Sequence, residues 1–252
     1  MKACEIKVED DFRVISGPCA FESVSQIQSF LDQTHSKLLR AGIFKLRTSP
    51  TSFQGLREKA IDYIRDLKKN NDFCFVSEVV SEASVELLEP VVDVFQVGAR
   101  NMYNYELLKY LNKFNKPIIL KRSFSATLEE WLSAASYIEN SVERVILCER
   151  GIRTFETAYR NTFDINAIIY LKQNTDYKIY VDPSHGSGDS QYVKKLTVAA
   201  FMAGADGALI EVHPKPSESL SDAKQALSCD EFLDVISELR LLSDITKRKV
   251  IF

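Results

Sequence analysis

The sequence predicts an α/β protein that folds as a single (β/α)8 barrel. Eight short apolar runs recur along its 252 residues, helical patterns lie between them, and no linker rich in proline, glycine or serine divides the chain. The runs are nearly continuous in apolar residues, as in strands buried on both faces of a parallel sheet. About 250 residues is a usual length for such a barrel. A doubly wound open sheet is the alternative, but the first strand-to-helix turn lacks its glycine-rich fingerprint.

The eight predicted strands are rich in β-branched and aromatic residues. In chain order they are FRVIS (12–16), IFKLR (43–47), FCFVSEVV (73–80), VFQVGA (94–99), PIILKR (117–122), RVILCER (144–150), KIYVDPS (178–184) and GALIEVHP (207–214). Strands that alternate with helices in this way favour a parallel sheet, and closing eight of them into a ring leaves no exposed edge.

Helical patterns with apolar stripes fill several of the intervals. They occupy residues 23–42, 125–140, 190–207 and 228–244. The first opens on a serine, and its apolar stripe extends to Leu38 and Leu39. In the second, Ser125 or Thr127 is suitably placed to cap the helix, with two glutamates in the first turn.

Composition excludes several functional classes. The net charge is −3, which gives no electrostatic reason to expect nucleic acid or an anionic membrane as a partner. No apolar run reaches the roughly 18–20 residues of a membrane span, and the first residues lack an apolar signal segment. Five widely spread cysteines without a CxxC pair argue against a disulfide framework and for a reducing compartment. We therefore expect a cytoplasmic protein.

Polar side chains follow every predicted strand, at the end of a barrel that carries the active site. Seven of them are cationic: Lys45, Arg47, Arg100, Lys121, Arg122, Arg150 and Arg153. Arginine presents forked donors that match phosphate and carboxylate oxygens, and lysine presents a compact charge. Such a ring, in a chain of negative net charge, predicts one or two substrates with several negative charges. For any single member, a salt bridge with an acidic neighbour is the alternative.

A second group has the chemistry of metal ligands. Cys19 follows the first strand, His185 follows the seventh, Glu211 ends the eighth, and Asp222 is a fourth candidate. Their spacing alone is no evidence, but barrel closure makes the first and last strands neighbours. Thiolate, imidazole and carboxylate donors suit Zn²⁺, Mn²⁺, Fe²⁺ or Co²⁺ better than Mg²⁺ or Ca²⁺. A buried structural thiol and a structural histidine are the alternatives.

Seven segments together carry a family resemblance. They are GPCAFES (17–23), KLRTSPTSFQG (45–55), QVGARNM (96–102), KPIILKRSFSATLEEW (116–131), VILCERGIRTFE (145–156), VDPSHGSG (181–188) and IEVHPKPSESLSD (210–222). In this order they resemble the 3-deoxy-D-arabino-heptulosonate 7-phosphate (DAHP) synthases, in the compact type Iβ branch related to 3-deoxy-octulosonate 8-phosphate synthase. The resemblance covers the chain from about Val14 to Asp222.

The resemblance implies a (β/α)8 barrel and a metal-dependent transferase. Phosphoenolpyruvate would condense with erythrose 4-phosphate to give DAHP and inorganic phosphate, the first step of the shikimate pathway toward aromatic amino acids. One divalent ion (Mn²⁺, Fe²⁺, Zn²⁺ or Co²⁺) and a homo-oligomer, dimer or tetramer, are implied as well. Cys19 itself favours metal dependence, because some octulosonate synthases that need no metal carry asparagine there.

The same motifs imply residue roles. The implied metal ligands are Cys19, His185, Glu211 and Asp222. The implied phosphoenolpyruvate-binding residues are Lys45, Gln96, Ala99, Arg100, Lys121 and Arg153. The implied sugar-phosphate contacts are Arg47, Thr48 and Ser49. Glu78 and Glu149 would line the reacting centre, and the implied catalytic residues are Lys45, Glu149, His185 and Cys19.

One departure bears on substrate choice. The family motif usually reads Lys-Pro-Arg-Thr-Ser, whereas Leu46 replaces the proline here and every charged or hydroxyl group is kept. The octulosonate synthases carry an Asn-Arg-Ser-Ser type of motif, so the four-carbon sugar is favoured. An octulosonate 8-phosphate synthase that uses arabinose 5-phosphate is the alternative. A barrel that only binds phosphorylated ligands, without turnover, is the second.

The resemblance also bears on domain organisation. Only about a dozen residues precede the first predicted strand. We therefore expect one catalytic domain over residues 1–252, without the N-terminal regulatory domain or the C-terminal mutase domain of some relatives. We expect an enzyme that is insensitive to feedback inhibition by phenylalanine or tyrosine.

Overall fold

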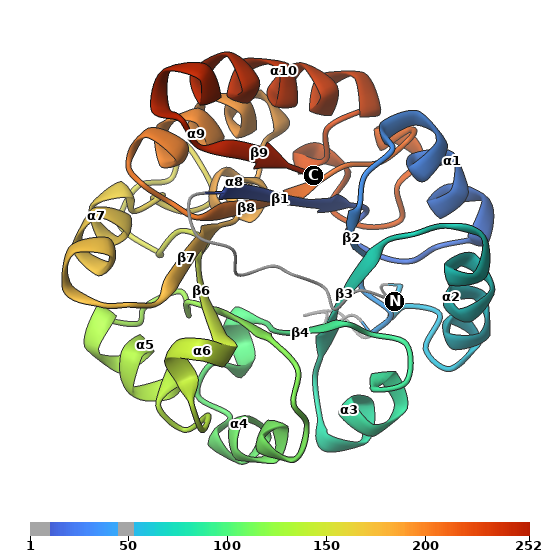
Figure 1. Cartoon of the computed structure of the whole chain (residues 1–252), viewed down its shortest axis with the longest axis horizontal. Helices are drawn as coiled ribbons and strands as arrows, with labels where there is room; N and C mark the ends of the chain where they lie inside the picture. The colour runs from blue at the N-terminus through green and yellow to red at the C-terminus, as the bar shows by residue number, and fades with distance from the viewer. Residues whose placement is uncertain (1–10, 45–52) are drawn as a thin grey trace.

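The structure is a computed structural model that describes residues 11–44 and 53–252. Its strands form a closed parallel barrel, and the helices pack around the outside of the ring (Figure 1). From β2 to β8 each strand pairs with the next one in the chain, and β1 closes the ring by pairing with both β8 and β2. The predicted (β/α)8 barrel is confirmed.

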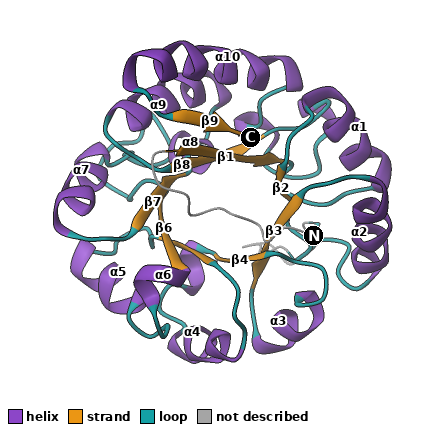
Figure 2. Cartoon of the chain, in the orientation of Figure 1, coloured by secondary structure: helices purple, strands orange, loops and turns teal. Residues whose placement is uncertain are grey.

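The barrel strands are short, and a further strand lies outside them. They are β1 (Asp11–Gly17), β2 (Leu38–Arg40), β3 (Cys74–Val79), β4 (Val94–Val97), β5 (Ile118–Lys121), β6 (Val145–Glu149), β7 (Lys178–Val181) and β8 (Gly207–Glu211). The sequence analysis does not predict β9 (Lys249–Ile251), which pairs in parallel with the first half of β1 (Figure 2).

Helices lie in every strand-to-strand connection. They are α1 (Val24–Thr34), α2 (Lys59–Asn70), α3 (Glu82–Leu88), α4 (Tyr105–Tyr110), α5 (Leu128–Ala135), α6 (Ser141–Arg144), α7 (Ile165–Asn174), α8 (Pro183–Ser187), α9 (Ser190–Met202) and α10 (Cys229–Thr246). Short 3-10 turns supplement them at η1 (Ala99–Asn101), η2 (Leu111–Lys113), η3 (Pro216–Glu218) and η4 (Ala223–Gln225). None of the described helices is long and apolar enough to cross a membrane.

Two apolar clusters hold the barrel together. The smaller one takes at least one residue from each of β1 to β8, from Ile15 to Leu209, as expected for side chains that fill the interior of a small barrel. The larger one packs the outer strand faces against the helices. The polar strand ends therefore stand on a filled core that leaves no open pore beneath the site.

Helix α5 shows how local sequence sets an element. Thr127 is its N-cap: the hydroxyl accepts from the amide of Glu130 at 3.1 Å, and the Glu130 carboxylate accepts from the amide of Thr127 at 2.8 Å. This is a capping box. The helix carries Trp131, which is fully buried, donates from its indole nitrogen to the Leu120 carbonyl at 3.2 Å and lies 5.9 Å from the Arg122 guanidinium.

The second predicted strand is wrong, and so is the predicted end of the first helix. Helix α1 ends at Thr34 because His35 adopts a left-handed conformation, with φ of 54°. Leu38 and Leu39, predicted in the helix stripe, lie in β2. They fall seven and eight residues after Leu31, a spacing that a helix would also produce. The described part of the run predicted at 43–47 is not in a strand.

The cysteines also differ from expectation in one case. Cys74 is disulfide-bonded, although the five widely spread cysteines argue against a disulfide framework. Cys19, Cys148 and Cys229 are free and buried. An odd cysteine count thus argues against a framework of bridges but does not exclude a single one.

Candidate active site

The four predicted metal ligands lie together at the carboxyl ends of the strands. One donor atom from each of Cys19, His185, Glu211 and Asp222 lies within 4.8 Å of the others. The Cys19 Sγ is 3.0 Å from the Asp222 Oδ2, and the His185 Nε2 is 3.4 Å from the Glu211 Oε1. The pairing of β1 with β8 and of β8 with β7 brings Cys19, His185 and Glu211 together, and Asp222 joins them from the segment after β8.

The turn after β1 directs Cys19 toward the cluster. Gly17, paired with Glu211 across the β1–β8 register, has φ of 140°, and a Cβ atom there would lie 2.3 Å from the Arg40 carbonyl oxygen. Only glycine fits this close approach of two backbones. The Cys19 carbonyl then accepts a hydrogen bond from the Gly42 amide at 3.2 Å. The glycine of the Gly-Pro sequence before Cys19 is therefore required sterically.

Asp182 orients His185. As N-cap of α8, it accepts from the His185 amide at 2.9 Å, and its other oxygen lies 2.7 Å from the His185 Nδ1. That contact leaves the Nε2 for the cluster, as in the carboxylate–histidine pairs of metal sites. Burial opposes ionisation of Asp182, but His185 and the bonded Lys121 hold its pKa well below the usual range. Burial lowers the pKa of His185 despite Asp182 and Glu211, which favours the neutral imidazole.

Arg40 and Gln225 hold Glu211. Arg40 Nη1 donates to the Glu211 Oε1 at 2.7 Å, and the Gln225 Nε2 donates to the Oε2 at 2.6 Å. Burial opposes the charge of Arg40, but Glu211, Cys19 and Asp182 together outweigh burial and raise the pKa of Arg40. Neither residue is predicted from the sequence. Arg40 was missed because the second strand was predicted at 43–47. It ends the observed β2 and so belongs with the other cationic residues at strand ends.

The donor set fits a borderline divalent ion. A thiolate, an imidazole nitrogen and two carboxylates converge, and the histidine ring is held by a buried carboxylate. Such a mixed set excludes neither Zn²⁺ nor Mn²⁺, Fe²⁺ or Co²⁺, and it differs from the all-oxygen shell of Ca²⁺.

Three of the predicted cationic residues surround one aromatic ring. The guanidinium groups of Arg150, Arg100 and Arg153 lie 4.7, 5.5 and 5.6 Å from the centre of Phe124. Within residues 11–44 and 53–252, no carboxylate pairs with any of the three. Burial lowers the pKa of Arg150 to about 10. Three guanidinium groups at one ring, without a carboxylate partner among the described residues, offer forked hydrogen-bond donors that suit an anion.

The chain matches the family model described as the DAHP synthetase I family over residues 4–247. The chain belongs to the DAHP synthetase I family. It is 42% identical over 243 residues to a phospho-2-dehydro-3-deoxyheptonate aldolase of Thermotoga maritima, a match that covers 95% of this chain and 72% of the relative. A 2-dehydro-3-deoxyphosphooctonate aldolase of Francisella philomiragia is 27% identical, over 90% of this chain and 91% of that relative.

Solved structures agree with this family assignment. The crystal structure of the Thermotoga maritima DAHP synthase matches with a TM-score of 0.91 and 42% identity, over 96% of this chain and 72% of that one. A truncated form of the Thermotoga maritima enzyme matches with a TM-score of 0.86 and 39% identity, over 96% of this chain and 90% of that one.

Two members of the predicted cationic ring are already paired in this DAHP synthetase I chain. Lys121 contacts Asp182. Arg122 Nη1 donates to Glu149 at 3.0 Å and to Asp164 at 2.9 Å, so for Arg122 the salt-bridge alternative holds. Glu149 is fully buried, and burial raises its pKa although Arg122 opposes that shift.

The predicted residues of the third and fourth strands also face one another. Glu78 and Gln96 pair across the β3–β4 register, and Gln96 is buried. A Cβ atom on Gly98 would lie 2.0 Å from the Glu78 Oε1, so the absent side chain makes room for this carboxylate. Ala99 begins η1 beside them.

Part of the predicted substrate site lies outside the described residues. This applies to Lys45, Arg47, Thr48 and Ser49.

Proposed function

We propose that this chain is a DAHP synthase, which condenses phosphoenolpyruvate with erythrose 4-phosphate and releases inorganic phosphate. The observation that carries the proposal is the juxtaposition of two sites at one barrel rim. Cys19, His185, Glu211 and Asp222, which could hold a metal ion, lie together beyond the ends of β1, β7 and β8, and the guanidinium groups of three arginines surround Phe124. The 42% identity to the Thermotoga maritima enzyme supports the same reaction.

The cationic residues would bind and orient the anionic substrates. Arg100, Lys121 and Arg153 would hold the phosphate and carboxylate of phosphoenolpyruvate with Lys45, while Gln96 and Ala99 line the same pocket. Arg47, Thr48 and Ser49 would bind the sugar phosphate. These contacts neutralise the repulsion between two polyanions and bring the enol carbon C3 against the aldehyde.

Cys19, His185, Glu211 and Asp222 would hold one divalent ion. When bound, this ion supplies Lewis-acid polarisation of the aldehyde oxygen. The C3 of phosphoenolpyruvate forms the new bond to the aldehyde carbon, water adds to C2, and the C2–O bond to phosphate then breaks. Asp182 keeps the His185 ring fixed during these steps, and Glu149 and Glu78 border the reacting centre as carboxyl groups that can exchange protons.

The test offers both aldehydes with phosphoenolpyruvate and follows phosphate release, with and without EDTA. We expect the larger kcat/KM for erythrose 4-phosphate, loss of activity with EDTA, and recovery on addition of Mn²⁺ or Co²⁺. Cys19→Ala should be inactive, whereas Cys229→Ala, which removes another free buried thiol, should remain active. A preference for arabinose 5-phosphate, or activity indifferent to EDTA and to Cys19→Ala, would overturn the proposal.

A further inference from the structure

The segment between β8 and α10 carries Asp222, and it has little regular structure of its own. It contains only the short turns η3 and η4. Asp222 itself has a left-handed backbone, with φ of 53°, and makes no side-chain cap to η4. A donor on such a segment is positioned by contacts from neighbouring elements, because no strand or long helix fixes its backbone.

Glu22, in the turn before α1, makes several of these contacts. Its Oε1 accepts from the Leu220 amide at 2.9 Å and from the Ser219 hydroxyl at 3.3 Å. These residues lie two and three positions before Asp222. The side chain of Glu22 is 11% exposed. Hydrogen bonds from a backbone amide and a hydroxyl to a shielded carboxylate are charge-assisted and hold the segment firmly.

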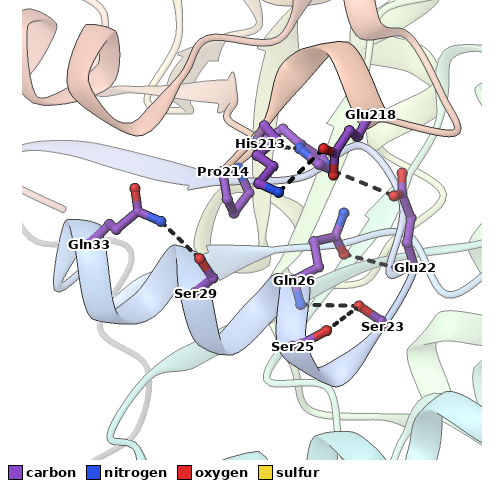
Figure 3. Close-up of a pocket in the computed structure, with 10 residues that line it drawn as sticks. Glu22, Ser23, Ser25, Gln26, Ser29, Gln33, His213, Pro214 and Glu218 are labelled. Carbon is purple, nitrogen blue, oxygen red and sulfur yellow. Dashed lines mark hydrogen bonds and ion pairs between the residues drawn. The ribbon is translucent and has the colours of Figure 1, made fainter.

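His213 ties the start of the same segment to Glu22. Its amide donates to the Leu227 carbonyl at 2.9 Å, and its Nδ1 accepts from the Lys215 amide at 3.0 Å. Because the Nδ1 accepts a hydrogen bond, the Nε2 is the ring nitrogen that can donate, and it lies 3.4 Å from the Glu22 Oε2. Figure 3 shows a dashed line between His213 and Glu22, and both side chains line a pocket of about 540 Å³.

The turn that carries Glu22 is itself well anchored, and it also carries Cys19. The amide of Glu22 donates to the Gln26 Oε1 at 3.0 Å, and Ser23 caps α1. The Phe21 amide donates to the Gly42 carbonyl at 3.0 Å. One short turn therefore presents a donor to the metal-ligand cluster and, three residues later, a carboxylate that holds the segment with another donor.

We propose that Glu22, supported by His213, is a positioning residue that holds Asp222 against Cys19 and so preorganises the metal site. This inference rests on the proposed metal site, but not on the identity of the sugar substrate. Neither residue needs to touch the metal or the substrates. Partners of this kind commonly change metal affinity by about 10- to 100-fold when they are removed.

The test measures binding of Co²⁺ alone to the purified chain, through the thiolate-to-cobalt absorption band and the rate of Co²⁺ loss to a chelator. We expect Glu22→Ala to weaken Co²⁺ binding by about 10- to 100-fold, with faster loss. Glu22→Gln, which keeps one acceptor oxygen, should fall between Glu22→Ala and wild type. At saturating Co²⁺ the kcat of both variants should approach that of wild type, which separates positioning from catalysis.

Ser29→Ala is the matched control, because Ser29 lines the same pocket and its hydroxyl, among the residues that the structure describes, accepts from Gln33 and makes no contact with Glu22 or His213 (Figure 3). It should bind Co²⁺ as wild type does. Melting of the metal-free proteins checks folding, and Ser219→Ala replaces Glu22→Ala if the latter does not fold. The inference is overturned if Co²⁺ affinity is unchanged both in Glu22→Gln and in Glu22→Ala, or in Ser219→Ala where that variant replaces Glu22→Ala. It is also overturned if Ser29→Ala reduces Co²⁺ affinity as much as the Glu22 variants do.

The outcomes also separate this inference from the proposed reaction. A wild-type chain that binds Co²⁺ through Cys19 but forms no DAHP refutes the reaction, while the Glu22 effect on binding can still be measured and confirmed. A wild-type chain that binds no Co²⁺ refutes both.

Discussion

The side chain of Arg122 illustrates how one residue can couple several parts of the site. It donates from a single nitrogen to Glu149 and to Asp164, and its Nε donates to the Ala126 carbonyl at 3.0 Å. Burial opposes the charge on Arg122, but the two carboxylates raise its pKa. Removing either partner would leave buried charge less well compensated, which is costlier than the pair itself is stabilising.

The buried Glu149 leads to a prediction on pH dependence. The pKa of Glu149 is raised above the usual 4.5 in the folded chain. At pH values between the unfolded-state pKa and this higher folded-state pKa, the folded chain therefore binds more protons than the unfolded chain. The free energy of unfolding therefore falls as pH rises through this window. In Glu149→Gln the free energy of unfolding should not show this decrease with pH, because the glutamine does not titrate. Urea unfolding of both proteins over a series of pH values measures the difference.

Glu156→Gln is the control for that experiment. The backbone amides of Ala158 and Thr157 lower the pKa of the exposed Glu156. The contribution of Glu156 to the free energy of unfolding therefore increases as pH rises, opposite to that of Glu149. A stability difference between wild type and Glu149→Gln that does not vary with pH would contradict the prediction.

At the scale of single residues, side chains with distinctive chemistry could be predicted from the sequence. Residues that act by holding those side chains in place could not. A thiol, an imidazole and carboxylates at strand ends are recognisable without a structure, and Cys19 and His185 do lie together. Arg40 and Gln225 were missed because their importance lies in contacts with Glu211. Such contacts depend on register and on loop paths that residue type does not encode.

At the scale of elements, predictions succeeded where a cap or a turn marks the boundary. The start of α5 was predicted by its capping residues. The boundary between α1 and β2 was not predicted. The left-handed residue that ends α1 is His35 and not the glycine that usually marks a helix end, and Leu38 and Leu39 fit the spacing of a helix as well as that of a strand. Short parallel strands such as β2 offer too few residues for periodicity to decide.

The cap of α5 provides a prediction at this scale. Thr127→Ala removes the hydroxyl that accepts from the Glu130 amide, and we expect a loss of about 1 kcal/mol in the free energy of unfolding. Denaturant unfolding measures it. Ser125→Ala is the matched control at the other candidate cap and should change stability by less than about 0.5 kcal/mol. Equal losses in the two variants would show that the capping box does not stabilise α5.

At the scale of the whole molecule, ring closure is what assembles the site. The β1–β8 pairing brings the first and last barrel strands together, and the cluster spans that seam. A closed barrel could be predicted from the rhythm of strands and helices, and with it the neighbourhood of Cys19 and Glu211. The outer strand β9 could not be predicted, because three residues with a lysine at one end carry no strand signal.

Because the cluster joins residues from both sides of the seam, metal binding should stabilise the whole fold. A ligand that binds only the folded chain adds about 2.7 kcal/mol at a hundredfold excess over its Kd, and each kcal/mol raises Tm by about 2–4 °C for a chain of this size. We expect Co²⁺ to raise the Tm of wild type by several degrees and to leave that of Cys19→Ala unchanged. Thermal melts monitored by circular dichroism measure this, and an equal rise in both proteins would contradict it.

The burial of Trp131 beside Arg122 has a practical consequence. It is the chain's single tryptophan, and its indole lies 5.9 Å from a guanidinium that bonds directly to Glu149. A change of charge at Glu149, or an anion that draws Arg122 away, alters the electric field across the indole. We therefore expect the emission of this one fluorophore to report changes around Arg122 and Glu149, and stopped-flow fluorescence with phosphoenolpyruvate tests this in the unlabelled wild-type chain.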